Sequence, residues 1–149
     1  MVSSLNEQEI EEVLTDNVWG HLGCNDGFNT YVYPSNYIYD GKYILCHSQV
    51  GSKVMVMRNN IRVCFQVDEV ENHKNWRSVM VHGDYQELTD ERERYAAMKA
   101  FLDRRLFVKI SKDHIDSAQV NEPLELMEAS RPAIYRIVID EKTGRYESD

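Results

Sequence analysis

Two tight-turn signals in the first third of the chain restrict the fold more than any other feature of the sequence. Residues 25–27 read Asn-Asp-Gly and residues 40–41 read Asp-Gly, and such glycine-containing turns are typical of β-hairpins. The segments beside them, residues 18–24, 30–39 and 42–47, contain the aromatic and β-branched side chains that favour strands. We therefore expect three consecutive antiparallel strands and not the alternating strands and helices of a parallel sheet.

Further strand patterns predict the rest of the sheet. They cover residues 61–68, 76–85 and 133–139. Six or seven antiparallel strands with short flanking helices predict a mainly β (α+β) fold, a small barrel with helices at its margins. Because no repeat, low-complexity segment or linker divides the sequence, residues 1–149 are expected to form one domain.

Short helices are expected at three places between the strands. A capping box of Ser4 and Glu7 would start an N-terminal helix, and Thr89 or Asp90 would cap a later one. Between them, a short helix follows the strand that ends at residue 47. Residues 107–128 show no clear period and are expected to be irregular.

Composition and charge exclude several classes of protein. The net charge of −8 over 149 residues argues against a general binder of nucleic acid or anionic membranes, because the summed field would repel both. The start of the chain is polar and acidic, and no apolar run approaches a membrane span, so a cytoplasmic location is expected. The cysteines, Cys24, Cys46 and Cys64, are widely spaced and are expected to be buried free thiols.

Residues 43–60 contain a candidate site for an anion. A strand ends in polar residues and runs into a short helix that ends at Asn-Asn. The free amides of the helix start, the hydroxyls of Ser48 and Ser52, and the charge of Lys53 would together suit a phosphate. In the simpler alternative, one of these serines only caps the helix and Lys53 is solvated.

Residues 30–39 carry tyrosines at alternate positions, and Pro34 stands in their midst. Proline cannot donate to the ladder of a sheet, so this strand is expected at an edge or a bulge, with backbone groups left free. Tyr37 and Tyr39 are expected to pack in the barrel wall or in a subunit interface.

The sequence lacks the common catalytic and metal-binding motifs. There is no G-x-S-x-G, P-loop or G-x-G-x-x-G. A zinc site would require Cys46 or His47 to meet Cys24 or Cys64 across strands, and their spacing gives no support for it, so no metal is expected. No side chain is assigned a catalytic role, and His47, directly before the candidate anion site, is the weak candidate for one.

An ordered set of segments resembles a known flavoprotein family. Residues 31–36, 43–53, 59–68, 76–83 and 135–145 together resemble the pyridoxamine 5′-phosphate oxidase-like proteins, with the nitroimidazole-resistance branch the most similar. The resemblance covers nearly the whole chain. It implies a split β-barrel that forms a homodimer and binds FMN in two clefts at the subunit interface.

The resemblance also implies which residues hold the cofactor. The phosphate would lie against His47, Ser48 and Lys53, which agrees with the anion site inferred from the residues alone. The isoalloxazine ring would lie along residues 31–34. Ser78, together with Trp76, would reach the flavin from the strand after the polar loop, either in the same chain or from the partner subunit. The full set of expected cofactor contacts is Tyr31, Val32, Tyr33, Pro34, Cys46, His47, Ser48, Lys53, Trp76 and Ser78.

The resemblance implies an FMN-dependent oxidoreductase that passes electrons to a small molecule such as a nitroaromatic. The substrate-binding Arg and His segment of the true pyridoxamine phosphate oxidases is not recognised, so oxidation of pyridoxamine phosphate is not expected. Three alternatives stay open: haem or a deazaflavin as the cofactor, a non-catalytic storage or sensing protein with an axial histidine (His21, His47 or His82), and a structural dimer with an empty cleft.

Overall fold

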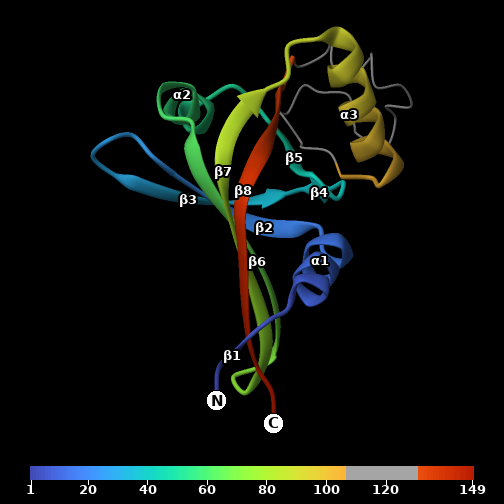
Figure 1. The fold of residues 1–149 in the computed structure, drawn as a ribbon. Helices are drawn as coiled ribbons and strands as arrows, with labels where there is room; N and C mark the ends of the chain where they lie inside the picture. Colours follow the sequence, from blue (N-terminus) through green and yellow to red (C-terminus); the bar gives the residue numbers. More distant parts are fainter. Residues whose placement is uncertain (107–130) are drawn as a thin grey trace.

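A curled antiparallel sheet forms the body of the protein, and this computed structural model describes residues 1–106 and 131–149. Within these residues the sheet has 8 strands, and three helices lie around it (Figure 1). The strands are β1 (Ser3–Ser4), β2 (Trp19–Asn25), β3 (Thr30–Asn36), β4 (Ile38–Tyr39), β5 (Tyr43–Ser48), β6 (Arg62–Asn72), β7 (Asn75–Glu87) and β8 (Ala133–Glu147). The helices are α1 (Glu7–Asp16), α2 (Ser52–Asn59) and α3 (Glu91–Asp103).

The strand order is β3-β2-β6-β7-β8-β5-β4, with β1 paired to the far end of β8. In Figure 1 the long strands β6, β7 and β8 run from the top, where α2 and α3 lie, down to the β6–β7 turn near both termini. The sheet curls so that β3 contacts β5, although the two strands are far apart in the strand order. The predicted mainly β, split-barrel fold is therefore confirmed.

A bulge where β7 meets β8 helps the sheet to curl. The register between the two strands shifts at His82 and Gly83. A Cβ on Gly83 would lie 2.2 Å from the carbonyl oxygen of Val138, so the backbones approach too closely there for any side chain. Glycine at this position is therefore a requirement of the fold.

The core fills the inside of the curled sheet. Alternate residues of β6 and β7 point inward and are buried, as the period-two pattern predicts. Phe65 is fully buried and its ring packs edge-to-face on Tyr37, with ring centroids 5.1 Å apart. Helix α1 closes the lower part of the core with the buried side chains of Val13 and Leu14.

The long extended stretch expected at residues 30–39 is divided in the structure. β3 ends at Asn36, and Tyr37 turns inward and donates a hydrogen bond to the carbonyl oxygen of Leu14 at 2.7 Å. Tyr37 and Tyr39 are buried, which confirms their predicted packing role. In the described part of the sheet β3 pairs with β2 alone, so Pro34 lies on an edge strand as predicted.

The expected N-terminal cap is wrong by two residues. The capping box of α1 is formed by Asn6 and Glu9, whose side chains each accept a backbone hydrogen bond from the other residue. Ser4 instead belongs to β1, where pairing with β8 fixes its backbone. Asp90 caps α3 as predicted. The segment expected to be irregular, 107–128, lies outside the described residues.

No helix in the described part of the chain has the length and apolarity needed to cross a membrane.

Candidate functional site

The turn between β5 and α2 forms the centre of the candidate site. β5 ends at Ser48, and Gly51 is the N-cap of α2, with no side chain to cap the helix. The first backbone bond of the helix runs from the N–H of Met55 to the carbonyl of Gly51 at 3.1 Å, so the N–H groups of residues 52–54 have no partner within the helix. A Cβ on Gly51 would meet nothing within 4 Å. Within the described residues, the helix start therefore faces open space and its first N–H groups have no acceptor.

Lys53 lies at this helix start, and the described part of the chain offers it no counter-ion. Its Nζ is 5.4 Å from the centre of the Tyr33 ring, and no acceptor or carboxylate among residues 1–106 and 131–149 contacts it. Burial lowers the pKa of this ammonium group, and the nearby Cys46 and Cys24 thiols oppose the shift. A half-buried cation without an anionic partner pays a desolvation cost that a bound anion would offset.

The edge strand β3 lies opposite this helix start. Tyr31 and Tyr33 are stacked on its inner side, with ring centroids 6.2 Å apart, and the Tyr31 hydroxyl donates to Asp26 at 2.9 Å. The side chains of Val32 and Pro34 are exposed on its outer side. The strand thus offers two fixed rings and unpaired backbone groups to a planar ligand.

Ser48 and Cys46 have different roles at the candidate site. Ser48 is nearly buried, and its hydroxyl donates to the carbonyl oxygen of Gln49 at 3.0 Å. Cys46 lies in the core, where burial raises the pKa of its thiol to about 11. Because a neutral thiol is a weak nucleophile, Cys46 acts here as a packing residue beneath Lys53.

His47 points away from this site and toward α3. Its Nε2 donates a hydrogen bond to the carbonyl oxygen of Leu106 at 2.9 Å, and its ring packs edge-to-face on Phe101 at 4.4 Å. The side chain is only 4% exposed. The structure therefore places its backbone beside Ser48, while its ring belongs to the contact between β5 and α3.

The burial of His47 gives stability a pH dependence that can be measured. Burial lowers the pKa of His47 below its usual value, with the Leu106 hydrogen bond opposing the shift. The folded state therefore favours the neutral ring, so the unfolded state binds more protons just below about pH 6.5. We expect the free energy of unfolding to have its full value above that pH. It should decrease as the pH falls toward and through the folded-state pKa of His47. Denaturant unfolding between pH 7.5 and 5.5 measures this.

The control for this prediction is a second histidine. His47→Gln should lose part of the pH dependence, whereas His73→Gln, at the exposed β6–β7 turn, should keep it. Equal pH slopes for wild type and His47→Gln would contradict the prediction.

Trp76 and Ser78 lie elsewhere in the chain, near the β6–β7 turn at the bottom of Figure 1, whereas α2 is at the top. The indole Nε1 of Trp76 donates to Glu147 at 3.3 Å. Ser78 accepts a hydrogen bond from Gln66 at 3.1 Å on the outer face of the sheet. One chain therefore brings together Tyr31, Tyr33, Ser48 and Lys53, but not Trp76 or Ser78.

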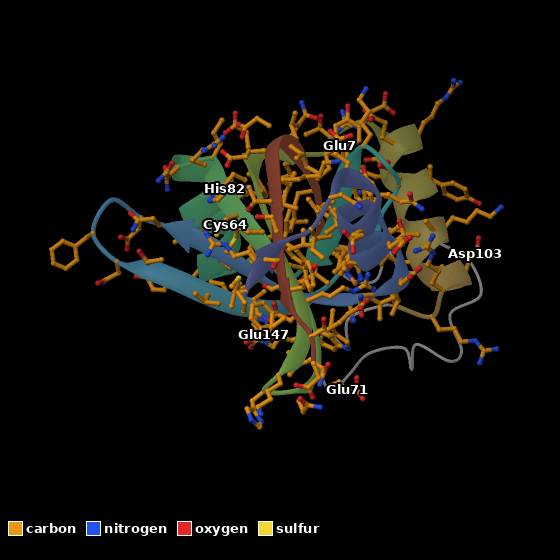
Figure 2. All side chains as sticks on the ribbon, turned by 60° about the horizontal axis from the view of Figure 1, so that its bottom comes forward. Glu7, Cys64, Glu71, His82, Asp103 and Glu147 are labelled. Carbon is orange, nitrogen blue, oxygen red and sulfur yellow. The ribbon has the colours of Figure 1, made fainter. Side chains whose placement is uncertain are left out.

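The outer face of the sheet also carries Cys64 and His82. These residues are direct partners across β6 and β7, and both are labelled in Figure 2. His82 Nδ1 is buried and has no hydrogen-bond partner among the described residues. The cysteines in the structure are free, and no group of three or more metal-ligating side chains occurs in residues 1–106 or 131–149.

Two residues of the site were missed from the sequence. Gly51 leaves the helix start uncapped. The sequence signal for this is a glycine immediately before Ser52-Lys53, where a capping side chain would otherwise stand. Asp26 was assigned only to a turn, but its carboxylate also fixes Tyr31 and accepts backbone bonds from Phe28 and Asn29. These bonds lower the pKa of Asp26 and keep it ionised.

Comparison with known proteins identifies relatives of the whole chain. A structure of an FAD-binding protein from Mesorhizobium loti is 30% identical, covers 99% of both chains and has a TM-score of 0.79. A structure described as a candidate 5-nitroimidazole antibiotic resistance protein from Bacteroides thetaiotaomicron shares the fold, with 20% identity, a TM-score of 0.70, and coverage of 98% of this chain and 87% of that one.

An uncharacterized protein of Rhizobium meliloti (strain 1021) is 32% identical over 87 residues, and the match spans 58% of each chain. A family model described as pyridoxamine 5′-phosphate oxidase matches residues 6–146. This match agrees with the curled sheet and with the uncapped helix start beside edge strand β3. The chain belongs to the pyridoxamine 5′-phosphate oxidase family.

Proposed function

We propose that this protein is an oxidoreductase that binds FMN at the turn between β5 and α2. The observation that carries the proposal is Lys53, a half-buried cation without an anionic partner in the described residues, at a helix start with free N–H groups. A phosphate has the charge and the acceptor atoms that this arrangement lacks. When bound, the flavin supplies the capacity to accept electrons and pass them on.

The residues around Lys53 would orient the rest of the cofactor. The ring would lie along β3, against the stacked Tyr31 and Tyr33 and the free backbone at Val32 and Pro34. The similar protein from Mesorhizobium loti is described as FAD-binding, which supports a flavin at this site. FMN is the form for which one phosphate site is sufficient.

A homodimer would complete the cleft. Trp76 and Ser78 are too far along β7 to join Lys53 in the same chain, so in this proposal they reach the flavin of the partner subunit. Trp19 and Val32 are exposed on the outer side of β2 and β3 and offer apolar area for such a contact. The dimer would act on a small molecule, and a nitroaromatic is the acceptor that we propose to test.

No observation favours haem over flavin. The Nε2 of His47 is already bonded to Leu106 in a buried setting, so axial ligation would break that contact. His21 and His82 lie on the outer face of the sheet, away from the β5–α2 turn.

The first test is an absorbance spectrum of protein that has been saturated with FMN and then freed of excess by gel filtration. We expect the bands of oxidised flavin at an equimolar ratio to the chain, and bleaching of these bands by a reductant followed by recovery with a nitroaromatic. A Soret band in untreated protein, with no flavin retained, would favour haem. A colourless protein would contradict the functional proposal and leave the fold unchanged.

A further inference from the structure

A pocket of about 260 Å³ is lined by residues of α2, α3 and the segment that leads into β8. We call it the arginine pocket because Arg58, Arg94 and Arg131 line it. The helices α2 and α3 lie at the top of Figure 1, together with the end of β7 and the start of β8. Lys53 is not among the lining residues, so a ligand of this pocket would be a different molecule from one bound at Lys53.

Positive charge exceeds negative charge among the residues that line the arginine pocket, although the chain as a whole is acidic. The two carboxylates of the lining already have arginine partners. Arg58 donates to both carboxylate oxygens of Glu87, at 2.8 and 2.9 Å. Arg131 lies 3.5 Å from Glu91. The charge of Arg94 therefore has no carboxylate of its own among the lining residues.

Arg94 is a buried guanidinium group, with 8% of its surface exposed. Its terminal nitrogens donate to the carbonyl oxygens of Leu88, at 3.4 Å, and Pro132, at 3.0 Å. Its Nε is buried and has no partner among residues 1–106 and 131–149. Carbonyl oxygens satisfy hydrogen bonds but not a net charge, and buried charges in proteins are normally paired. An anion in the pocket would offset the charge of Arg94.

Two exposed side chains of the lining could hold such an anion. The side chain of Arg131 is 66% exposed, and its partner Glu91 is 63% exposed. An exposed pair of this kind contributes little stability, so Arg131 can turn to a ligand at little cost. Thr89 is also exposed, and its hydroxyl makes no hydrogen bond with another described residue. The charge of Arg94 lies beneath these two donors.

A phosphate group suits this arrangement better than a carboxylate does. Phosphate carries up to about two negative charges and offers more acceptor oxygens, whereas a carboxylate has one charge and two oxygens. The pocket is smaller than the clefts of about 300–1,000 Å³ that hold drug-sized ligands, so it suits a compact phosphate and not a nucleotide.

We infer that the arginine pocket is a binding site for a small phosphate, either free or on a compact monoester, that is separate from the cofactor. The inference does not rest on the proposed flavin site, because none of the contacts that carry it involves Lys53 or β3.

The test is a titration of ¹⁵N-labelled protein with inorganic phosphate, followed by amide NMR at constant ionic strength. The amides of Leu88 and Thr89 report on the arginine pocket, and those of Ser52 and Lys53 report on the start of α2. We expect saturable shifts at Leu88 and Thr89, with a dissociation constant of about 1 mM. Because the two sites are observed separately, the result does not depend on whether the protein binds FMN.

Two variants at the exposed pair should change the affinity in opposite directions. Arg131→Gln removes a phosphate contact and should weaken binding about tenfold. Glu91→Gln removes the competing carboxylate and should tighten binding about threefold. Arg92→Gln and Glu93→Gln are the matched controls, because they make the same charge changes in the first turn of α3 outside the pocket. Both controls should leave the affinity nearly unchanged.

Arg94→Gln tests the buried charge itself. The variant loses the charge but keeps an amide that can donate to a carbonyl oxygen, and it should weaken phosphate binding about as much as Arg131→Gln does. If Arg94→Gln does not fold, Arg131→Gln and Glu91→Gln decide the question alone.

Two further probes define the ligand. Glycerol 3-phosphate that binds more tightly than inorganic phosphate would identify a monoester, and weaker binding would identify free phosphate. Malonate that binds more tightly than either would overturn the assignment to phosphate and make the pocket a carboxylate site.

Two other results would overturn the inference altogether. Shifts confined to the start of α2 would mean that phosphate binds there and not in the arginine pocket. Equal losses of affinity in Arg131→Gln and Arg92→Gln would show a general effect of charge without a site. In either case Arg94 would be a structural link between two carbonyl groups.

Discussion

Phe65→Ala is expected to lower the free energy of unfolding by about 3–5 kcal/mol. Phe65 is 0% exposed and packs on the ring of Tyr37 in the middle of the core. The backbone of Gly20 adjoins it, so closely that a Cβ there would lie 2.1 Å from the Phe65 ring. Since β2 and β6 are held in register by backbone bonds, the walls of the new cavity can close only in part.

Urea unfolding of the flavin-free protein, at one protein concentration, measures this loss. Phe28→Ala is the matched control, because Phe28 lies in the turn after β2 with 90% of its surface exposed. Its replacement should change the free energy of unfolding by less than about 0.5 kcal/mol. If both variants lost the same stability, Phe65 would not be the centre of the core that the structure describes.

The elements that could be predicted are those with a local signal. Gly27 and Gly41 have φ of 94° and 93°, the left-handed conformation that the Asn-Asp-Gly and Asp-Gly turns require. The alternation along β6 and β7 predicted which side chains are buried. The candidate anion site could be proposed from the sequence because Ser48, the start of α2 and Lys53 are adjacent in the chain.

Features that depend on distant contacts could not be predicted. Ser4 and Asn6 are both good N-caps and both precede a Glu by three residues, and the pairing of β1 with β8 decides between them. Strand alternation puts Cys46 and His47 on opposite faces, but the position of α3 decides that His47 is covered by Phe101. No local pattern marks this choice.

The pocket that Arg58, Arg94 and Arg131 line is the clearest case of this limit. Arg58, Arg94 and Arg131 come from three segments that are far apart in the sequence, and each alone looks like a solvated surface charge. Only the fold shows that Arg94 is buried and has carbonyl partners alone among the described residues.

Lys53→Ala is expected to weaken FMN binding by about ten- to a hundredfold, which corresponds to about 1.5–3 kcal/mol for one charge-assisted phosphate contact. Titration of flavin-free protein with FMN measures this. Lys53→Arg should restore much of the affinity because it keeps the charge. Lys74→Ala, at the exposed β6–β7 turn, removes the same charge elsewhere and should have no effect.

The stability of the flavin-free variant separates a ligand-binding role from a structural one. Lys53 has no ion pair or hydrogen bond with any described residue, and burial already lowers the pKa of its ammonium group. Removing an uncompensated, half-buried cation should therefore leave the free energy of unfolding unchanged or raise it, while FMN binding is lost. A structural lysine would show the opposite pattern, with lower stability and unchanged binding. If Lys53→Ala and Ser48→Ala both bound FMN as wild type does, the phosphate would lie elsewhere, and the uncapped start of α2 would have no role in cofactor binding.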